Sequence, residues 1–507
     1  MTTDVLLIHP PVNFKLKGEP AMSSLYIGYG LLHIAAALRK SGYTVTVWNL
    51  EEALMMGIPE DVIKERIISL DPKIVGVEMN WVHFGKGALQ TARLVKEALE
   101  NVPVIIGGLN ASFFAKEIVQ KYHDVVDGVL RGEAEKTFLK VAESVENGRN
   151  LKDIGGLVWF EGKVRENPLR KDDLYENIDE IPPYSWRVVK HVIWDVPMTR
   201  APLMVSINSC RGQCPYKCVY CVGGKIGSVM GRTKYTVHSP EWIVEQVNLL
   251  REEGAEEFAF QDDLYLAGKK RLINIMKTLR KEGVTDNVLG FNMTSIPGFL
   301  DRETLREACR AGVFNIDYGV ETGSADVLRI CRRPTTIERI LDSMKVTISE
   351  GIIPFTWWMT GLPGETFEDI DKTFKLIDQT ISLGGIPKWV TPVIAIPGTD
   401  MFDRAEEYGV KLRLKTFDDF LVFSDLKSRH MSSHLAAITH ETEHMSAYDI
   451  LNAALSIKRY IYSKRKEILW IFKKHLNSIA SRHPNLSADM LEKRIKDHID
   501  YIPKTFF

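Results

Sequence analysis

Residues 206–224 read SINSCRGQCPYKCVYCVGG, and this stretch carries four of the six cysteines in the chain. Within it, Cys214, Cys218 and Cys221 stand at C-x3-C-x2-C spacing, with Tyr220 directly before the last cysteine. Three closely spaced thiolates suit an iron–sulfur cluster, because a tight loop can wrap one cuboidal cluster and leave its fourth iron open. The stretch therefore predicts a cluster loop at the end of a strand.

The C-x3-C-x-aromatic-C pattern resembles the signature of radical S-adenosylmethionine (SAM) enzymes. The resemblance implies that Cys214, Cys218 and Cys221 hold a [4Fe–4S] cluster whose open iron binds SAM and cleaves it to a 5′-deoxyadenosyl radical. A zinc knuckle or a four-cysteine cluster that also uses Cys210 is the alternative, since four cysteines can close a tetrahedral site. The strand-end motifs further along the chain favour the open iron, with Cys210 as a bystander.

The composition of the chain limits its partners and location. At 507 residues the chain has room for several domains, and its formal charge of −1 and pI near 6.9 give no electrostatic case for binding nucleic acid or an anionic membrane. Few, clustered cysteines indicate a reducing compartment rather than a disulfide framework. The start lacks a leader pattern and no apolar run is long enough to cross a bilayer, so we expect a cytoplasmic, anaerobic, oxygen-sensitive protein.

Residues 1–150 alternate short apolar strands with helical stretches. The expected strands are 5–8, 44–48, 74–78 and 103–106, and the expected helices are 28–39, 61–69 and 85–99. This alternation predicts a parallel, doubly wound, Rossmann-like sheet. Such sheets bind ligands beyond the carboxyl ends of their strands.

This region resembles the cobalamin-binding domain that precedes many radical SAM domains. The resembling features are the strand ending in Pro10-Pro11, the helix entry at residues 26–31, the Gly107-Gly108 turn and residues 129–135. Paired glycines let a backbone approach a flat macrocycle closely. The cobalamin contacts that the resemblance implies are Pro11, Asn13, Tyr26, Gly28, Trp81, His83, Gly107, Gly108, Leu109, Asn110, Gly132 and Glu133.

Two alternatives remain open for this region. It could be a flavodoxin-like sheet that binds another ligand or none, and Trp81 and His83 could equally serve packing or an interface. No D-x-H-x-x-G motif occurs in the chain, so we expect a base-off corrinoid without a histidine ligand.

The rest of the chain divides into a linker with a small hairpin at 151–200, a partial barrel at 201–410 and a mainly helical cover domain at 411–507. The barrel strands are expected at 203–209, 257–261, 288–293, 315–320, 353–360 and 389–396, each followed by a helix or a short turn. Six βα units fall short of a full eight-unit barrel, which predicts a (βα)6 wall open on one side.

The loops at the carboxyl ends of these strands again resemble the radical SAM family. They carry D-D at 262–263, E-T-G at 321–323, G-L-P-G-E at 361–365 and P-G-T at 397–399. An ammonium group and ribose hydroxyls need carboxylate acceptors near an otherwise apolar site. The alternative for each carboxylate is capping of the following helix. The SAM contacts that the resemblance implies are Tyr220, Asp262, Asp263, Asn292, Glu321, Thr360 and Ile396.

Several further features allow more than one interpretation. Of the neighbouring Trp357 and Trp358, one should face into the barrel and one toward the outer helices. Cys309 and Cys331 are expected to be structural thiols. A helix start at 446–449 precedes a helical stretch at 450–475, whose basic face has the members Lys458, Arg459, Lys464, Arg465 and Lys466. The spacing of His430, His434, His440 and His444 would allow a metal site if the segment were a helix.

The combined resemblance implies a cobalamin-dependent radical SAM C-methyltransferase that moves a methyl group from methylcobalamin to an unactivated carbon. No protein nucleophile is required, because the cofactors supply the chemistry. The open barrel and the basic helix favour a peptide or protein substrate, such as methyl-coenzyme M reductase, and ferredoxin or flavodoxin is the expected electron donor. The alternatives are a radical SAM cyclase or rearrangement enzyme that uses cobalamin without methyl transfer, and a non-catalytic corrinoid-binding protein.

Overall fold

The computed structural model describes residues 3–15, 27–148, 151–194, 196–198, 201–202, 204–260, 262, 264–426 and 433–480. The chain folds into two compact units, each of which is treated by itself. Unit 1 comprises Met1–Ala201, Ile226–Lys234 and Leu414–Ser428, and unit 2 comprises Pro202–Lys225, Tyr235–Arg413 and Arg429–Phe507. Two short segments from the later chain therefore belong to the first unit. We call Ile226–Lys234 the strap.

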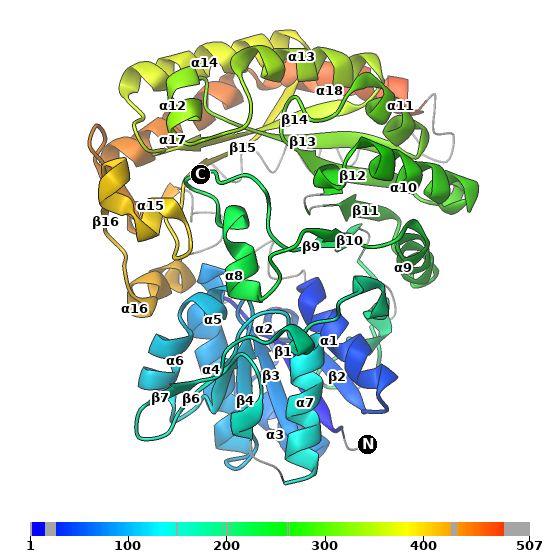
Figure 1. The fold of residues 1–507 in the computed structure, drawn as a ribbon, viewed down its shortest axis with the longest axis vertical. Helices are drawn as coiled ribbons and strands as arrows, with labels where there is room; N and C mark the ends of the chain where they lie inside the picture. Colours follow the sequence, from blue (N-terminus) through cyan, green and yellow to red (C-terminus); the bar gives the residue numbers. More distant parts are fainter. Residues whose placement is uncertain are drawn as a thin grey trace. The chain divides into compact units, whose positions relative to one another are not determined.

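Unit 1 is built on a seven-stranded sheet in the order β2-β1-β3-β4-β5-β6-β7, of which the first five strands are parallel (Figure 1). The strands are β1 (Val5–His9), β2 (Val45–Asn49), β3 (Ile74–Glu78), β4 (Val104–Gly107), β5 (Gly128–Leu130), β6 (Leu157–Phe160) and β7 (Val164–Glu166). Strands β1 and β3 are buried along their whole length and β4 is buried except at Gly107, as expected for a parallel sheet covered on both faces. The predicted Rossmann-like sheet is confirmed.

The hairpin of β6 and β7 is part of unit 1, whereas the sequence placed it in a separate linker. β6 pairs antiparallel with β5, through Val129–Val158 and Leu130–Leu157, so the hairpin extends the sheet of unit 1. Backbone pairing to an existing strand edge satisfies groups that an isolated hairpin would leave to water.

The helices of unit 1 bury the two faces of its sheet. They are α1 (Tyr29–Lys40), α2 (Leu50–Met55), α3 (Glu60–Leu70), α4 (Gly85–Ala98), α5 (Leu109–Phe113), α6 (Ala115–Tyr122), α7 (Glu135–Glu146), α8 (Ile226–Met230) and α16 (Phe417–Phe420). Helix α4 lies so close to the loop after β1 that a Cβ at Gly87 would collide with the carbonyl oxygen of Pro11. Glycine is required there by backbone approach.

We expect Gly87→Ala to destabilise the protein by roughly 1–3 kcal/mol, because α4 must move away from the loop that it covers. Gly30 in α1 is the matched control, since a Cβ there meets nothing within 4 Å. Gly30→Ala should be neutral or stabilise by up to about 1 kcal/mol through helix propensity. Thermal unfolding of the two variants measures the difference, and equal midpoints would contradict the close approach.

Unit 2 contains a six-stranded parallel sheet in the order β15-β14-β13-β12-β11-β8. Its strands are β8 (Met204–Ser206), β11 (Glu257–Phe260), β12 (Gly290–Ser295), β13 (Val313–Glu321), β14 (Ile353–Thr360) and β15 (Ile386–Pro392). Its crossover helices are α9 (Pro240–Glu252), α10 (Lys269–Lys281), α11 (Arg302–Arg310), α12 (Ala325–Ile330), α13 (Ile337–Ser349) and α14 (Phe367–Ser382). Figure 1 shows α12, α13 and α14 together on one side of β13 and β14. The predicted half-barrel is confirmed, and among the described residues no further strand pairs with its edge strands β8 and β15.

The remaining elements of unit 2 are smaller. They are β9 (Cys210–Arg211) paired with β10 (Thr236–Val237), α15 (Asp400–Asp403), β16 (Val410–Leu412) paired with β17 (His440–Thr442), α17 (Ala447–Ser463) and α18 (Arg465–Ala480). Ser446 and Asp449 form the predicted capping box at the start of α17. The predicted long helix is interrupted at Lys464, and its basic face is not continuous, because Lys458 is 5% exposed and burial lowers its pKa to about 8.

The three described histidines of the series, His434, His440 and His444, do not lie on a helix. His440 is in β17, where its Nε2 is 2.7 Å from the carbonyl oxygen of Gly361 and burial lowers its pKa to about 4. His434 begins a short 3-10 turn instead, and His430 lies outside the described residues. The i, i+4 spacing of His440 and His444 therefore does not place them on one helix face. Within the described ranges, no helix is long and apolar enough to span a membrane.

Candidate cofactor sites

The cluster loop is closed by its own backbone. The amide of Cys214 donates to the carbonyl of Gly223 at 3.0 Å, and the amide of Cys221 donates to the carbonyl of Cys218 at 3.0 Å. Cys218 is buried, Cys214 is half-buried and Cys221 is exposed. Among the residues that the structure describes, no three His, Cys, Asp or Glu side chains converge as ligands of a single metal ion. A cuboidal cluster does not need such convergence, since each cysteine bonds a different iron.

Two later segments hold this loop in place within unit 2. The amide of Val219 donates to the carbonyl of Cys331, and the carbonyl of Val219 accepts from the amide of Met401, at 3.0 and 2.9 Å. Tyr220 packs in an apolar cluster with Val393 and other buried residues of the P-G-T region. The structure thus brings together the two segments expected to hold adenine. The carbonyl of Ile396 itself accepts from the Thr399 hydroxyl at 2.8 Å.

Asp262 lies at the end of β11, but its carboxylate is engaged with the approach to the cluster loop. One oxygen accepts from the amides of Ser209 and Cys210, and the other accepts from the Ser209 hydroxyl at 2.8 Å. Asp262 thus fixes the backbone at Cys210, and its contact with the methionine amino group or the ribose of SAM stays a prediction. Asp263 lies outside the described residues.

Glu321, Arg333 and Cys218 form a buried cluster beside the loop. The Arg333 Nη2 atom is 3.1 Å from Glu321 Oε1 and donates to the carbonyl of Gly319 at 2.7 Å, and its Nη1 lies 4.0 Å from Cys218 Sγ. A Cβ at Gly319 would collide with both charged groups. Glu321 has φ 72°, a left-handed conformation that is strained for a non-glycine residue. Such strain persists where the surroundings force it, often at functional sites.

Burial and the Arg333 charge have opposite effects on the pKa values of Glu321 and Cys218. Burial raises the pKa of Glu321, and the Arg333 guanidinium opposes that rise. Burial also raises the pKa of the Cys218 thiol, and Arg333 again lowers it toward the thiolate that iron requires. The Arg333 Nε atom is buried, with no hydrogen-bond partner among the described residues. Arg333 is therefore a candidate functional residue that the motifs did not identify.

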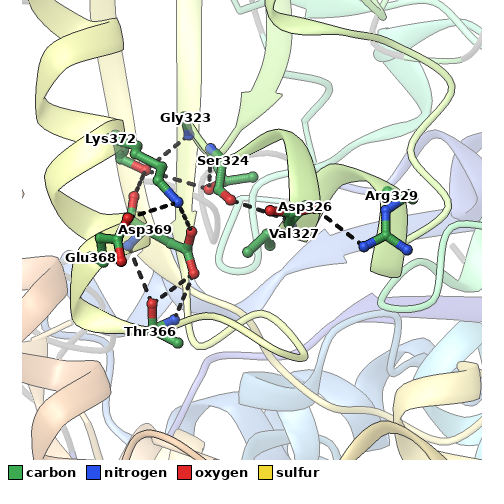
Figure 2. A network of polar contacts seen from close by, with 11 residues as sticks. Gly323, Ser324, Asp326, Val327, Arg329, Thr366, Glu368, Asp369 and Lys372 are labelled. Atoms are coloured by element: carbon green, nitrogen blue, oxygen red, sulfur yellow. Dashed lines mark hydrogen bonds and ion pairs between the residues drawn. The ribbon is translucent and has the colours of Figure 1, made fainter.

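The E-T-G-S turn after Glu321 is fixed against the start of α14 (Figure 2). Ser324 caps α12, and Thr366 forms a capping box with Asp369 at the start of α14. The amide of Gly323 donates to the Thr373 hydroxyl at 2.9 Å, and a Cβ at Gly323 would collide with the carbonyl of Lys372. The helix-cap role considered for the strand-end carboxylate is filled by Ser324, which leaves Glu321 to its pair with Arg333.

Glu365 in the G-L-P-G-E loop is a buried carboxyl group. Its Oε2 accepts from the amides of Gly361 and Leu362 at 2.7 and 3.4 Å, while the buried Oε1 has no partner among the described residues. Burial raises the pKa of Glu365 to about 8, although the two amide bonds oppose the rise. Glu365 is therefore protonated at neutral pH.

The pKa of Glu365 predicts a stability that falls with pH. Between its ordinary pKa of 4.5 and its folded value of about 8, the folded state holds a proton that the unfolded state has released, so stability is lost as pH rises through this window. Glu365→Gln should remove the loss, and its melting temperature should rise relative to wild type from pH 5 to pH 8. The exposed Glu368 supplies the control Glu368→Gln. A difference between Glu365→Gln and wild type that does not change with pH would contradict a buried, protonated Glu365.

Two other predicted SAM contacts, Asn292 and Thr360, have hydrogen-bond partners within the protein. The Asn292 amide donates to the Glu257 carboxylate, and the Thr360 hydroxyl donates to the carbonyl of Ile450 on α17 at 3.2 Å, so Thr360 faces the helices. Of the two neighbouring tryptophans, Trp358 is 1% exposed and Trp357 is 39% exposed. Trp357 lies opposite Trp389 in the sheet register, with ring centroids 6.3 Å apart.

The carboxyl edge of the sheet in unit 1 presents one group of predicted cobalamin contacts. Asn110 is 3% exposed, and neither atom of its amide has a partner in the described part of the chain. Gly108 has φ 112°, and a Cβ there would collide with Met79. The side chain of Trp81 is 61% exposed. Gly107, Gly108, Leu109, Asn110 and Trp81 thus combine a tight glycine turn, an unsatisfied amide and an exposed ring.

The other predicted contacts are engaged within unit 1. The Asn13 amide donates to the carbonyl of Ser424 at 3.2 Å, and the carbonyl of His83 accepts from the Ser424 hydroxyl at 2.8 Å. Burial lowers the pKa of His83 to about 3, so its ring is neutral. A Cβ at Gly28 would collide with Glu78, which gives that glycine a packing role.

The predicted cobalamin contacts Pro11, Gly132 and Glu133 also lie against other parts of the protein. The carbonyl of Pro11 faces helix α4, Glu133 is paired with Arg232, and Gly132 has φ 88° beside the strap. Tyr26 lies outside the described residues. Packing inside unit 1 thus uses polar groups for which the sequence suggested a ligand.

Comparison with known proteins decides the family. Residues 24–142 match the B12 binding domain, and residues 209–377 match the radical SAM superfamily. The chain is a cobalamin-dependent radical SAM enzyme. The B12 match covers strands β2 to β5 and helix α5, which carries Asn110, and the radical SAM match covers the cluster loop and Arg333.

Relatives of this radical SAM enzyme include an uncharacterized methyltransferase of Pyrococcus horikoshii, 28% identical over 73% of this chain and 77% of that protein. The anaerobic magnesium-protoporphyrin IX monomethyl ester cyclase of Rubrivivax gelatinosus is 25% identical over 73% of this chain, and the match spans 65% of the cyclase. Among solved structures, the radical SAM methyltransferase TsrM from Kitasatospora setae, with cobalamin and a [4Fe–4S] cluster bound, has a TM-score of 0.66 at 19% identity, covering 82% of this chain and 81% of TsrM. The relatives of this enzyme thus include a methyltransferase and a cyclase.

The residues of this radical SAM enzyme fit its three cofactors. The loop presents three cysteines at C-x3-C-x2-C spacing, which a [4Fe–4S] cluster with one open iron would need as ligands. The unsatisfied Nε of Arg333 next to Glu321 suits the carboxylate and ammonium of SAM. The unsatisfied amide of Asn110 beside the Gly107-Gly108 turn suits the polar rim of cobalamin.

Proposed function

We propose that this enzyme transfers a methyl group to an unactivated carbon of its substrate. The observation that carries the proposal is the buried cluster of Glu321, Arg333 and Cys218, in a chain that also has a B12 binding domain. When bound, the cluster and SAM supply a carbon radical on the substrate, and cobalamin supplies the methyl group. The similarity to methyltransferases supports this direction.

The residues of the chain bind and orient SAM rather than react. Arg333 would donate its unsatisfied Nε to the SAM carboxylate, and Glu321 would accept from the SAM ammonium group. Both side chains are about 10% exposed, so water competes weakly for these bonds. The apolar cluster around Tyr220 would cover the adenine. Holding SAM in one geometry lowers the entropic cost of reaction.

We further propose a peptide or protein side chain as substrate, with methyl-coenzyme M reductase as one candidate, and a ferredoxin or flavodoxin as electron donor in the cytoplasm. The unpaired edges of the half-barrel support a large substrate, since a closed barrel would exclude it. The basic helix gives less support than its sequence suggested, because Lys458 is buried. The proposal on substrate class therefore rests on the open sheet.

The proposal is tested by anaerobic reconstitution with iron, sulfide and cobalamin, followed by mass spectrometry of the host proteome with and without the gene. We expect a mass gain of one methylene on a single peptide, together with S-adenosylhomocysteine and 5′-deoxyadenosine. If proteomes with and without the gene matched while a small metabolite gained the methylene, methyl transfer would stand and the substrate class would be wrong.

A radical cyclase is the second candidate function, favoured by the similarity to the Rubrivivax cyclase. Such an enzyme would form 5′-deoxyadenosine with substrate but no S-adenosylhomocysteine and no methylated product. The ratio of the two adenosine products therefore separates the candidates. A non-catalytic corrinoid protein would form neither product.

A further inference from the structure

We infer that the buried pair of Arg232 and Glu133 anchors the exit of the cluster loop to the B12 binding domain, which makes Arg232 a positioning residue for methyl transfer. The inference deepens the proposed function and rests on it for its kinetic consequence. Glu133 was predicted to contact cobalamin, and its engagement by the strap is what points to this different role.

The strap follows directly from the cluster loop. The last cluster cysteine is Cys221, and the chain enters unit 1 at Ile226 and returns to unit 2 after Lys234. A segment that leaves the radical SAM unit immediately after its metal ligands and folds into the cobalamin unit connects the two cofactor regions covalently. The residues that hold the strap in unit 1 therefore act a short stretch of chain beyond the last cluster cysteine.

The strap is held by two charged side chains removed from water. Arg232 Nε is 2.6 Å from Glu133 Oε1, and Arg232 Nη2 is 2.9 Å from Glu133 Oε2, a two-bond fork. The same Nη2 donates to the carbonyl of Tyr175 at 2.7 Å. The two side chains are only 7% and 8% exposed.

The backbone of the strap is hydrogen-bonded to the loop that carries Gly132 and Glu133. The amide of Glu133 donates to the carbonyl of Met230 at 3.3 Å, and a Cβ at Gly132 would come within 3.0 Å of that carbonyl oxygen. Gly132 also donates its amide to the Ser112 hydroxyl at 3.3 Å, at the end of helix α5. Helix α5 carries the unsatisfied amide of Asn110. The strap thus touches the loops that are the best candidates to hold cobalamin.

Stability alone does not explain this pair. Desolvating two charges costs about as much as their attraction returns, and an apolar pair of similar volume is often as stable. A bidentate guanidinium–carboxylate fork does fix direction as well as distance, and lysine cannot reproduce it. The chemistry therefore favours a role in placing the strap, with a requirement for arginine at residue 232.

The test compares Arg232→Lys and Arg232→Met with Arg302→Lys, which alters an arginine–glutamate pair whose arginine is 57% exposed. The first measurement is amide hydrogen exchange of the full-length apoprotein. Exchange in the strap should rise in Arg232→Met and rise less in Arg232→Lys, with no change in Arg302→Lys. Unchanged exchange in both Arg232 variants would overturn the anchor, whatever the enzyme turns out to catalyse.

The second measurement is the ratio of S-adenosylhomocysteine to 5′-deoxyadenosine in the anaerobic holoenzyme. A misplacement of about 1 Å can cost a hundredfold in rate, so we expect this ratio to fall roughly tenfold to a hundredfold in Arg232→Lys, with iron content retained. A parallel fall of both products would mean a purely structural role and overturn the positioning claim. If wild type formed no S-adenosylhomocysteine, the proposed function would fail and the exchange result would still decide the anchor.

Discussion

Cys214→Ala is expected to lose the iron–sulfur cluster and with it all 5′-deoxyadenosine formation, whereas Cys210→Ala should retain both. Each of the three thiolates bonds a different iron, so two cannot retain the cluster against exchange with solvent. Cys210 is buried in β9, and its amide is held by Asp262, an arrangement that needs no thiol. Iron content and the absorbance of the anaerobically reconstituted variants measure the first effect, and product analysis measures the second.

The pair of variants distinguishes the three-cysteine loop from a four-cysteine site. An equal loss of iron in Cys210→Ala and Cys214→Ala would show that all four cysteines are ligands, and the open iron that SAM requires would be absent. Cys309→Ala, on helix α11, is the control for cysteine removal as such.

Arg333→Met is expected to abolish SAM cleavage and to destabilise the protein by about 3–5 kcal/mol, because it leaves the buried Glu321 carboxylate without its cation. The neighbouring Arg332→Met is the matched control. Arg332 is 39% exposed, and its buried partner Asp400 keeps Lys225 and Arg404 as cations, so the loss of Arg332 should cost roughly 1 kcal/mol or less. Denaturant unfolding measures the stability, and anaerobic SAM binding and 5′-deoxyadenosine formation measure the function.

A double variant separates the two consequences of losing Arg333. In Arg333→Met combined with Glu321→Gln, no buried charge is left unpaired, so stability should recover in part while SAM cleavage stays absent. If cleavage returned with stability, Arg333 would act only as the partner of Glu321, and the direct contact with SAM would be refuted.

The sequence predicted the parts of this enzyme that local patterns determine. Cysteine spacing predicted the cluster loop, and the alternation of apolar strands with helices correctly predicted the two parallel sheets, since both signals lie within short windows. Asp262 and Glu321 were placed at the correct edge of their sheet, because strand direction follows from the βα order. The capping box at Ser446 and Asp449 is equally local.

The partners of those carboxylates could not be predicted from local patterns. Glu133 and Arg232 are 99 residues apart in sequence, and no periodicity links them. Asp262 was expected to meet SAM but accepts from Ser209 and Cys210, because the chain before the cluster loop runs beside β11. Arg333 carries no motif of its own. Its charge becomes informative only when the end of α12 is seen against β13.

The strap and Leu414–Ser428 are the least predictable elements of the fold. Both leave the unit to which their neighbours in sequence belong, and their anchors are tertiary: Glu133 for the strap, and the carbonyl of His83 for Ser424. Sequence order alone would assign both segments to unit 2, whereas both belong to unit 1. Because these two segments pack into unit 1, Asn13 and Glu133 have protein partners where a ligand was expected.

The central claim is methyl transfer by a cobalamin-dependent radical SAM enzyme, and its most direct test uses SAM with a deuterium-labelled methyl group. The wild-type holoenzyme, reduced anaerobically with its host extract, should place the labelled methyl on a single substrate carbon and form both S-adenosylhomocysteine and 5′-deoxyadenosine. Omitting cobalamin should remove the labelled product and the S-adenosylhomocysteine. Formation of 5′-deoxyadenosine with no label transferred, with or without cobalamin, would contradict the account.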